Sequence, residues 1–138
     1  MNPSLDKETI AEHYERASRR GLAAKFGSAF RGLSRGIRGE SNFFFHLFAA
    51  AVTIAASMVF KISAVEWCFV IVSITAVFAA EMFNTAIESL AQAVSRQYNP
   101  RIADALDIAA GAVSLVGLGA AIVGAVIFIP RLWPLFGW

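Results

Sequence analysis

The sequence predicts an all-α membrane protein, with an N-terminal amphipathic interfacial helix followed by three transmembrane helices. The 138-residue chain is 57% hydrophobic and only 16% charged, whereas an average soluble domain is about 45–50% apolar. The apolar residues gather in three stretches, near 43–60, 65–80 and 108–129. Each stretch approaches or reaches the about 20 residues that cross a bilayer as a helix. A very apolar soluble helical bundle is the alternative.

The first 40 residues are polar and contain no secretory signal pattern. We therefore expect one membrane domain over 1–138 that opens with a cytoplasmic and interfacial segment at 1–40. Between 22 and 38, apolar and basic residues separate onto opposite sides of a helix, as in a helix that lies on a membrane surface. A basic juxtamembrane segment without a catalytic part fits the same pattern. The apolar stripe is Phe26, Phe30, Leu33 and Ile37, and the basic side is Arg31, Arg35 and Arg38.

The three predicted spans are 41–60, 65–93 and 101–129. Only a tight turn fits between the first two, so these two spans are expected to be antiparallel neighbours. The second is long enough that its C-terminal third projects beyond the hydrocarbon, since a helix rises about 1.5 Å per residue. Turn residues Asn99 and Pro100 precede the third span.

Charge asymmetry predicts the orientation. Eight of the twelve Lys and Arg residues precede the first span. The positive-inside rule then places the N-terminus in the cytoplasm and the C-terminus outside. We expect a multi-pass protein of the bacterial cytoplasmic (inner) membrane, and no nucleic-acid partner. The eight residues are Lys7, Arg16, Arg19, Arg20, Lys25, Arg31, Arg35 and Arg38.

Three polar residues at the end of the second apolar run are the strongest candidates for chemistry. Glu81, Asn84 and Glu88 fall within about 60° of one another on a helix. Ionisable residues at the end of a span are costly and therefore candidates for function. Glu40 and Asp107 are expected at the same cytoplasmic boundary, which brings five polar side chains to one depth.

Spacing separates the roles of the two glutamates. Glu81 and Glu88 are about 10 Å apart along the helix axis, too far to share one hard cation at about 2.1 Å. Glu88 can hold Mg²⁺ with a carboxylate from another element, with Glu40 as the obvious partner. Glu81 lies deeper, where a lipid hydroxyl can reach it, which suits a general base. Asn84 lies between them and can orient a phosphate or a hydroxyl.

This arrangement suits phosphoryl transfer from MgATP to a lipid alcohol. No P-loop or protein-kinase glycine-rich motif is present, so any nucleotide site must be of another type. A small transporter that uses the same acidic residues as a cation or proton relay is an equally credible interpretation of the residues alone.

Three motifs resemble the prokaryotic diacylglycerol kinase family: E-x-N-F-x-x-H at 40–46, A-E-x-x-N-T-A-I-E at 80–88, and Y-N-P followed by D-I-A-A-G-A-V within 98–113. The first is closer to the undecaprenol kinase branch. The resemblance implies a homotrimer that transfers the γ-phosphate of MgATP to a membrane lipid hydroxyl, with undecaprenol or diacylglycerol as acceptor. By position, Glu81 resembles the catalytic base, and Glu40 and Glu88 resemble metal-binding carboxylates. Asn84 and Asp107 resemble residues that line the nucleotide site.

The chain departs from the family pattern at two positions. Leu106 stands where the family usually has a lysine, and Gln92 where it usually has an aspartate. Arg96, Arg101 or an arginine of the N-terminal helix can replace the missing positive charge, and a catalytically degenerate relative is the alternative. His46 is expected to be a packing or interfacial residue, and Glu66 a solvated anchor beside the outer turn.

Overall fold

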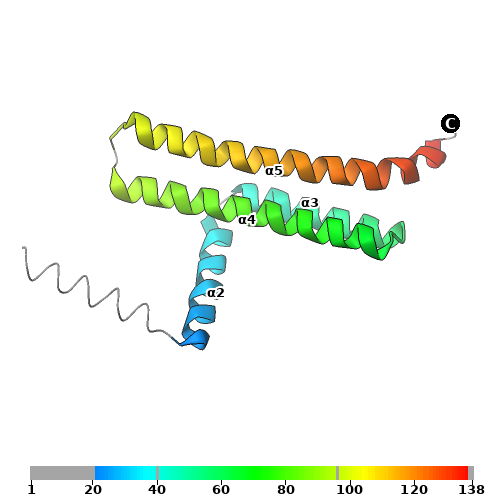
Figure 1. The fold of residues 1–138 in the computed structure, drawn as a ribbon, viewed down its shortest axis with the longest axis horizontal. Helices are drawn as coiled ribbons and strands as arrows, with labels where there is room; N and C mark the ends of the chain where they lie inside the picture. Colours follow the sequence, from blue (N-terminus) through cyan, green and yellow to red (C-terminus); the bar gives the residue numbers. More distant parts are fainter. Residues whose placement is uncertain (1–20, 40, 96, 137–138) are drawn as a thin grey trace, which may run out of the picture. The chain divides into compact units, whose positions relative to one another are not determined.

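The computed structural model describes residues 21–39, 41–95 and 97–136, and all regular secondary structure in this part of the chain is helical. The predicted all-α class is therefore confirmed. Contacts divide the chain into two units with the boundary between Arg38 and Gly39, and each unit is described by itself. The elements are α2 (Leu22–Gly39), α3 (Ser41–Val59), α4 (Ala64–Val94), α5 (Pro100–Leu132) and the short 3₁₀ helix η1 (Trp133–Phe136) (Figure 1).

The first unit contains the amphipathic helix α2, which begins directly after Gly21. Phe26 and Phe30 are 73% and 72% exposed, so these two members of the apolar stripe are uncovered. On the polar side, Arg31 donates to Ser28 Oγ at 3.1 Å, and Ser28 donates to the Ala24 carbonyl. An exposed apolar stripe opposite a basic side is the surface that an interfacial helix offers to a membrane.

The second unit begins with α3 and turns tightly into α4. Lys61 adopts a left-handed conformation with φ 50°. The amides of Lys61 and Ile62 donate back to the carbonyls of Met58 and Ser57 at 3.3 Å each. This is the Schellman pattern that ends a helix. Ser63 then caps α4 in a capping box with Glu66, which satisfies free amides at the new helix start.

A short connection joins α4 to α5, and the two long helices run antiparallel side by side (Figure 1). Asn99 caps α5 by accepting from the Arg101 amide at 3.0 Å. Pro100 occupies the first helical turn, where its missing N–H costs no helical hydrogen bond. Because the turn is short, the C-terminal end of α4 and the N-terminal end of α5 lie together.

The core of this unit lies near the α3–α4 turn. Ile62, Val70 and Ile127 are buried together, and the rings of Phe60 and Phe128 pack at 6.2 Å between centroids. At the other end of α3, the ring of Phe43 packs on that of Phe78 at 5.0 Å. These two contacts hold α3 against its neighbours at both of its ends.

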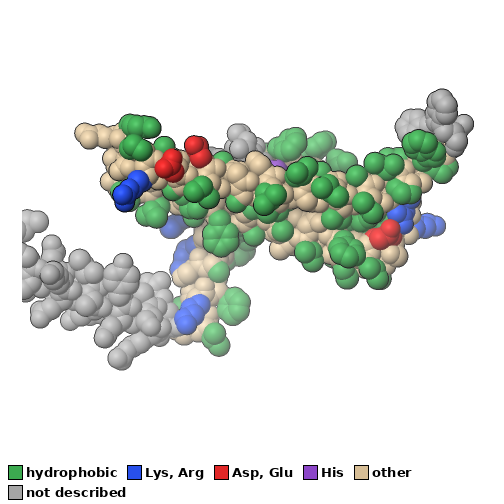
Figure 2. Space-filling view, turned by 45° about the horizontal axis from the view of Figure 1, so that its top comes forward, with side chains coloured by type: hydrophobic (Ala, Val, Ile, Leu, Met, Phe, Trp, Pro, Cys, Tyr) green, Lys and Arg blue, Asp and Glu red, His purple; other side chains and the backbone are tan. Residues whose placement is uncertain are grey.

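Most of the remaining surface of this unit is apolar. Figure 2 shows apolar side chains covering the visible face of the long helices, with charged side chains gathered toward the helix ends. Helices α4 and α5 are each long and apolar enough to cross a membrane, while the apolar part of α3, Phe43–Val59, is shorter. The membrane prediction is thus supported by the two helices α4 and α5. The third predicted span, in α3, stays a prediction.

Candidate active site

Glu81 is buried on α4 and contacts a histidine from another helix. Its Oε1 lies 2.7 Å from His46 Nε2 on α3, and the two side chains are 8% and 21% exposed. A buried carboxylate is costly unless a polar or charged group meets it. The structure therefore corrects the expectation that His46 is only a packing or interfacial residue, because it is the polar partner of the central carboxylate.

Asn84 and Glu88 form a second pair, one turn further along α4. Asn84 Nδ2 donates to Glu88 Oε1 at 2.7 Å. Asn84 Oδ1 is buried and accepts no hydrogen bond from the described part of the chain. A buried acceptor without a donor is unfavourable on its own. This oxygen is therefore a point where a ligand donor or a cation would satisfy the site.

A pocket of about 510 Å³, with polar and apolar walls, opens between the end of α4 and the start of α5. Glu88 and Asp107, which were expected at the same membrane depth, both line it. Leu106 and Gln92, the two departures from the family pattern, face the same pocket. The pocket is lined by Glu88, Ala91, Gln92, Ser95, Gln97, Tyr98, Asn99, Ile102, Ala103, Leu106, Asp107 and Ala110.

An apolar groove of about 470 Å³ lies among α3, α4 and α5. Small residues of α5 form one side of it, including Gly117, Ala121 and Gly124. No atom of the described chain lies within 4 Å of where a Cβ would stand on Gly117 or Gly124, so the space beside them is open. His46 lines this groove and also contacts Glu81, which joins the groove to the buried carboxylate.

Of the two predicted metal ligands, Glu40 and Glu88, the structure describes Glu88. Glu40 lies outside the described residues, so its relation to Glu88 stays a prediction. Among the residues that the structure describes, no group of three or more His, Cys, Asp or Glu side chains gathers as a metal cluster. Mg²⁺ commonly takes only one or two carboxylates, with water and substrate phosphates completing its shell, so a two-carboxylate site remains consistent with this arrangement.

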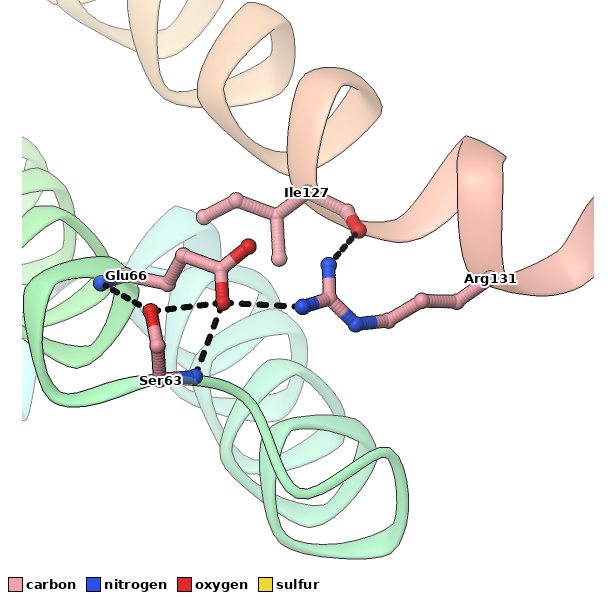
Figure 3. A network of polar contacts seen from close by, with 4 residues as sticks. All are labelled: Ser63, Glu66, Ile127 and Arg131. Carbon is pink, nitrogen blue, oxygen red and sulfur yellow. Dashed lines mark hydrogen bonds and ion pairs between the residues drawn. The ribbon is translucent and has the colours of Figure 1, made fainter.

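The opposite end of α4 carries a different polar network (Figure 3). Glu66 Oε2 accepts from the Ser63 amide at 2.8 Å, from Ser63 Oγ at 2.9 Å and from Arg131 Nη2 at 2.8 Å. Arg131 also donates to the Ile127 carbonyl. Glu66 was expected to be a solvated anchor beside the outer turn. Its side chain is indeed partly exposed, and it also ties the start of α4 to the end of α5.

The fold and the site define a class: a small helical membrane protein with carboxylates at one end of its apolar helices and an apolar groove leading to them. Residues 27–128 match the family described as prokaryotic diacylglycerol kinase, and the chain belongs to this family of transmembrane lipid kinases. The family was expected from the motifs at 40–46 and 80–88, and this expectation is confirmed.

Two curated relatives agree with the family assignment. The chain is 35% identical to an undecaprenol kinase of Bacillus subtilis (strain 168) over 107 residues, which cover 78% of this chain and 87% of that protein. It is 31% identical to a diacylglycerol kinase of Synechocystis sp. over 112 residues, which cover 80% of this chain and 64% of that protein. The chain is thus a lipid kinase, and the acceptor is a separate question.

Proposed function

We propose that the protein transfers the γ-phosphate of ATP, with Mg²⁺, to the hydroxyl of a membrane lipid alcohol at the cytoplasmic leaflet. The observation that carries this proposal is the buried Glu81, which the apolar groove reaches through His46. Undecaprenol is the first acceptor to test, because the match to the undecaprenol kinase covers more of that relative. Diacylglycerol is the second.

In this proposal Glu81 is the catalytic base. It accepts the proton of the lipid hydroxyl while that oxygen forms a bond to the γ-phosphorus of ATP. The bond between the γ-phosphorus and the bridging oxygen breaks, and ADP leaves with that bond's electron pair. Burial of Glu81 supports the role, because a positioned base in a water-poor site favours attack by the lipid over attack by water.

The residues around Glu88 fit Mg²⁺. They offer hard oxygen donors, namely the Glu88 and Asp107 carboxylates in one pocket, and the unpartnered Asn84 Oδ1 lies one turn away. Glu88 and Glu40 would hold the ion, while Asn84 and Asp107 would contact the nucleotide. When bound, Mg²⁺ neutralises charge on the ATP phosphates. Asn84 fixes the orientation of the Glu88 carboxylate by donating to it.

The pocket between α4 and α5 is the proposed nucleotide site. Its lining residues include no lysine or arginine, since Leu106 stands at the position where the motif resemblance leads one to expect a lysine. Arg101 is exposed in the first turn of α5, between the pocket residues Asn99 and Ile102. We propose that Arg101 supplies the positive charge for the phosphates in place of the absent lysine.

The proposed assembly is a homotrimer with three spans in each protomer. The N-terminus lies in the cytoplasm of a bacterial inner membrane and the C-terminus outside. Charge bias supports the orientation, because eight of the twelve basic residues precede α3. Large exposed side chains along α3, α4 and α5, such as Phe48, Val72 and Leu115, support contacts with lipid or with further copies of the chain.

The test is transfer of labelled γ-phosphate from ATP to a panel of lipids by the purified protein in mixed micelles, with and without Mg²⁺. We expect a labelled product from undecaprenol or diacylglycerol, only when Mg²⁺ is present. The preferred lipid identifies the acceptor. A folded, oligomeric protein that labels no lipid would contradict the proposal and favour a catalytically degenerate member of the family.

A further inference from the structure

His46 is the one ionisable side chain on the mostly apolar helix α3. Helix α3 consists mainly of Phe, Ala, Val, Ile and other small or apolar residues, and the His46 imidazole lies among them. The Phe45 ring packs edge-on against the imidazole, with 5.5 Å between centroids and an interplanar angle of 77°. A polar group in such surroundings needs a partner. The Glu81 carboxylate, 2.7 Å away, is that partner.

The contact also serves Glu81. In the described part of the chain, His46 is the polar partner of this carboxylate, and the contact uses only one of its two oxygens, Oε1. A general base starts as an ionised carboxylate, which can only accept, so the proposed mechanism places the hydrogen on the imidazole nitrogen that faces it. The other carboxylate oxygen, Oε2, is left for a different donor.

His46 stands where two parts of the site meet. It lines the apolar groove together with Val77 and Phe78, one turn before Glu81 on α4. A lipid chain in this groove would carry its polar end toward His46 and Glu81. The group that contacts the Glu81 carboxylate is therefore also a polar group in the wall of the groove.

We propose that His46 is a positioning residue for phosphoryl transfer: its Nε2–H holds Glu81 Oε1, so that Oε2 is oriented to receive the proton of the lipid hydroxyl. This inference rests on the proposed kinase function. The imidazole neither gains nor loses a proton in the step. The hydroxyl proton moves to Glu81 Oε2, the lipid oxygen bonds to the γ-phosphorus, and ADP leaves. Orientation of a general base by a second group is a recurring device in catalysis.

The test compares two near-isosteric variants, His46→Gln and His46→Met. Glutamine can place an amide N–H near the position of Nε2, whereas methionine has no donor. We expect His46→Met to lower kcat for the lipid by about 10- to 100-fold, as loss of an orienting partner does. The kcat of His46→Gln should be at least about fivefold higher than that of His46→Met. The KM for ATP should change less than about twofold in both variants, because His46 does not line the nucleotide pocket.

A structural role would give a different pattern. If His46 only packs, both variants lose the same activity, in step with their thermal stability in detergent, and the proposal is wrong. The proposal is equally wrong if both keep the wild-type kcat. His46→Asn provides a second control if His46→Met does not fold, since its shorter amide cannot reach Oε1 and its kcat should fall well below that of His46→Gln.

A double substitution tests the link to Glu81. In the Glu81→Gln background, His46→Met should lower the residual activity by less than about twofold, because groups that act together are not additive. A full independent loss in that background would overturn the link. The wild-type assay distinguishes failure of the proposed kinase function from failure of the role proposed for His46. An inactive wild type contradicts both. An active wild type with equal kcat in His46→Gln and His46→Met contradicts only the role of His46.

Discussion

The start of α4 (the Glu66 end) and the C-terminal half that follows from Glu81 (the Glu81 end) each hold a glutamate that contacts another helix, and the chain satisfies the two side chains differently. Glu66 Oε2 accepts from Ser63 N, Ser63 Oγ and Arg131 Nη2, all within 2.9 Å. Glu81 contacts one group, His46 Nε2. One turn further on, the buried Asn84 Oδ1 has no partner among the described residues.

We expect this difference to separate a structural carboxylate, Glu66, from the proposed catalytic one, Glu81. The Glu66 network is closed, because its donors come from the chain and hold the start of α4 to the end of α5. The Glu81 end keeps unused acceptors beside a groove and a pocket, and such capacity is costly unless a ligand meets it. Substitutions at the Glu81 end should therefore change activity, and substitutions at the Glu66 end should change stability.

The largest effect is expected for Glu81→Gln. Removing a general base lowers kcat by about 100- to 10,000-fold, while the neutral amide keeps the shape of the side chain, so the protein should still fold and assemble. Labelled phosphate transfer measures kcat, and gel filtration in detergent measures assembly. Glu66→Gln is the matched control on the same helix: it should lower the melting temperature and leave kcat near the wild-type value. Equal losses of kcat in the two variants would contradict the distinction between the two ends.

Glu88→Ala should change the response to Mg²⁺ in particular. If Glu88 is a ligand of the ion, the Mg²⁺ concentration for half-maximal activity rises at least about tenfold, and added Mg²⁺ restores part of the rate. A Mg²⁺ titration of initial rates measures this. Asp104→Asn is the control, because Asp104 is exposed on α5 and does not line the pocket. An unchanged Mg²⁺ dependence in Glu88→Ala would show that the roles of Glu81 and Glu88 are divided wrongly.

Arg101→Gln tests the origin of the positive charge in the nucleotide pocket. We expect the KM for ATP to rise about three- to tenfold, since an exposed cation contributes on the order of 1 kcal/mol. Adding Leu106→Lys to this variant should restore the wild-type KM, because it returns a cation to the pocket wall. If Leu106→Lys alone gives a large gain and Arg101→Gln gives no loss, Arg101 does not replace the lysine.

The smallest effect is expected for Ser63→Ala at the Glu66 end. The substitution removes the N-cap of α4 and should lower stability by about 1 kcal/mol, with kcat unchanged. Chemical denaturation in mixed micelles measures the change. The control is Ser114→Ala, which removes a hydroxyl that donates to the Ala110 carbonyl of the same helix and should leave stability nearly unaltered. Ser73→Ala is less suitable, because Ser73 lines the groove. A loss of activity in Ser63→Ala would link the two ends.

Local patterns were enough to predict the helices and part of the site. The stripe formed by Glu81, Asn84 and Glu88 follows from the helical period, and Asn84 and Glu88, four residues apart, are indeed bonded. The meeting of Glu88 and Asp107 follows from the short turn between α4 and α5. Helix α5 nevertheless begins at Pro100 and ends at Leu132, beyond the predicted 101–129, because capping and not hydropathy decides where a helix ends.

The long-range pairs could not be predicted. His46 and Glu66 find their partners on other helices, 35 and 65 residues away in sequence. Periodicity shows which side of a helix is polar, but it does not give the rotation and height of one helix against another. A lone polar residue in an apolar run is the available signal, and for His46 the sequence could not distinguish a packing residue from one that holds the carboxylate.

The continuous helix α4 also fixes the distance between two polar parts of the molecule. Its N-terminus is fixed by the Ser63–Glu66–Arg131 network. Glu81 lies about 22 Å from Glu66 along the helix axis. The polar network and the proposed base are thus held at a constant separation, while the thickness of the surrounding bilayer varies with its lipids. In a thin bilayer Glu81 would be lifted into water, and in a thick one it would be drawn below the headgroups. If Glu81 is the proposed base, we expect lipid acyl-chain length to control turnover independently of acceptor concentration.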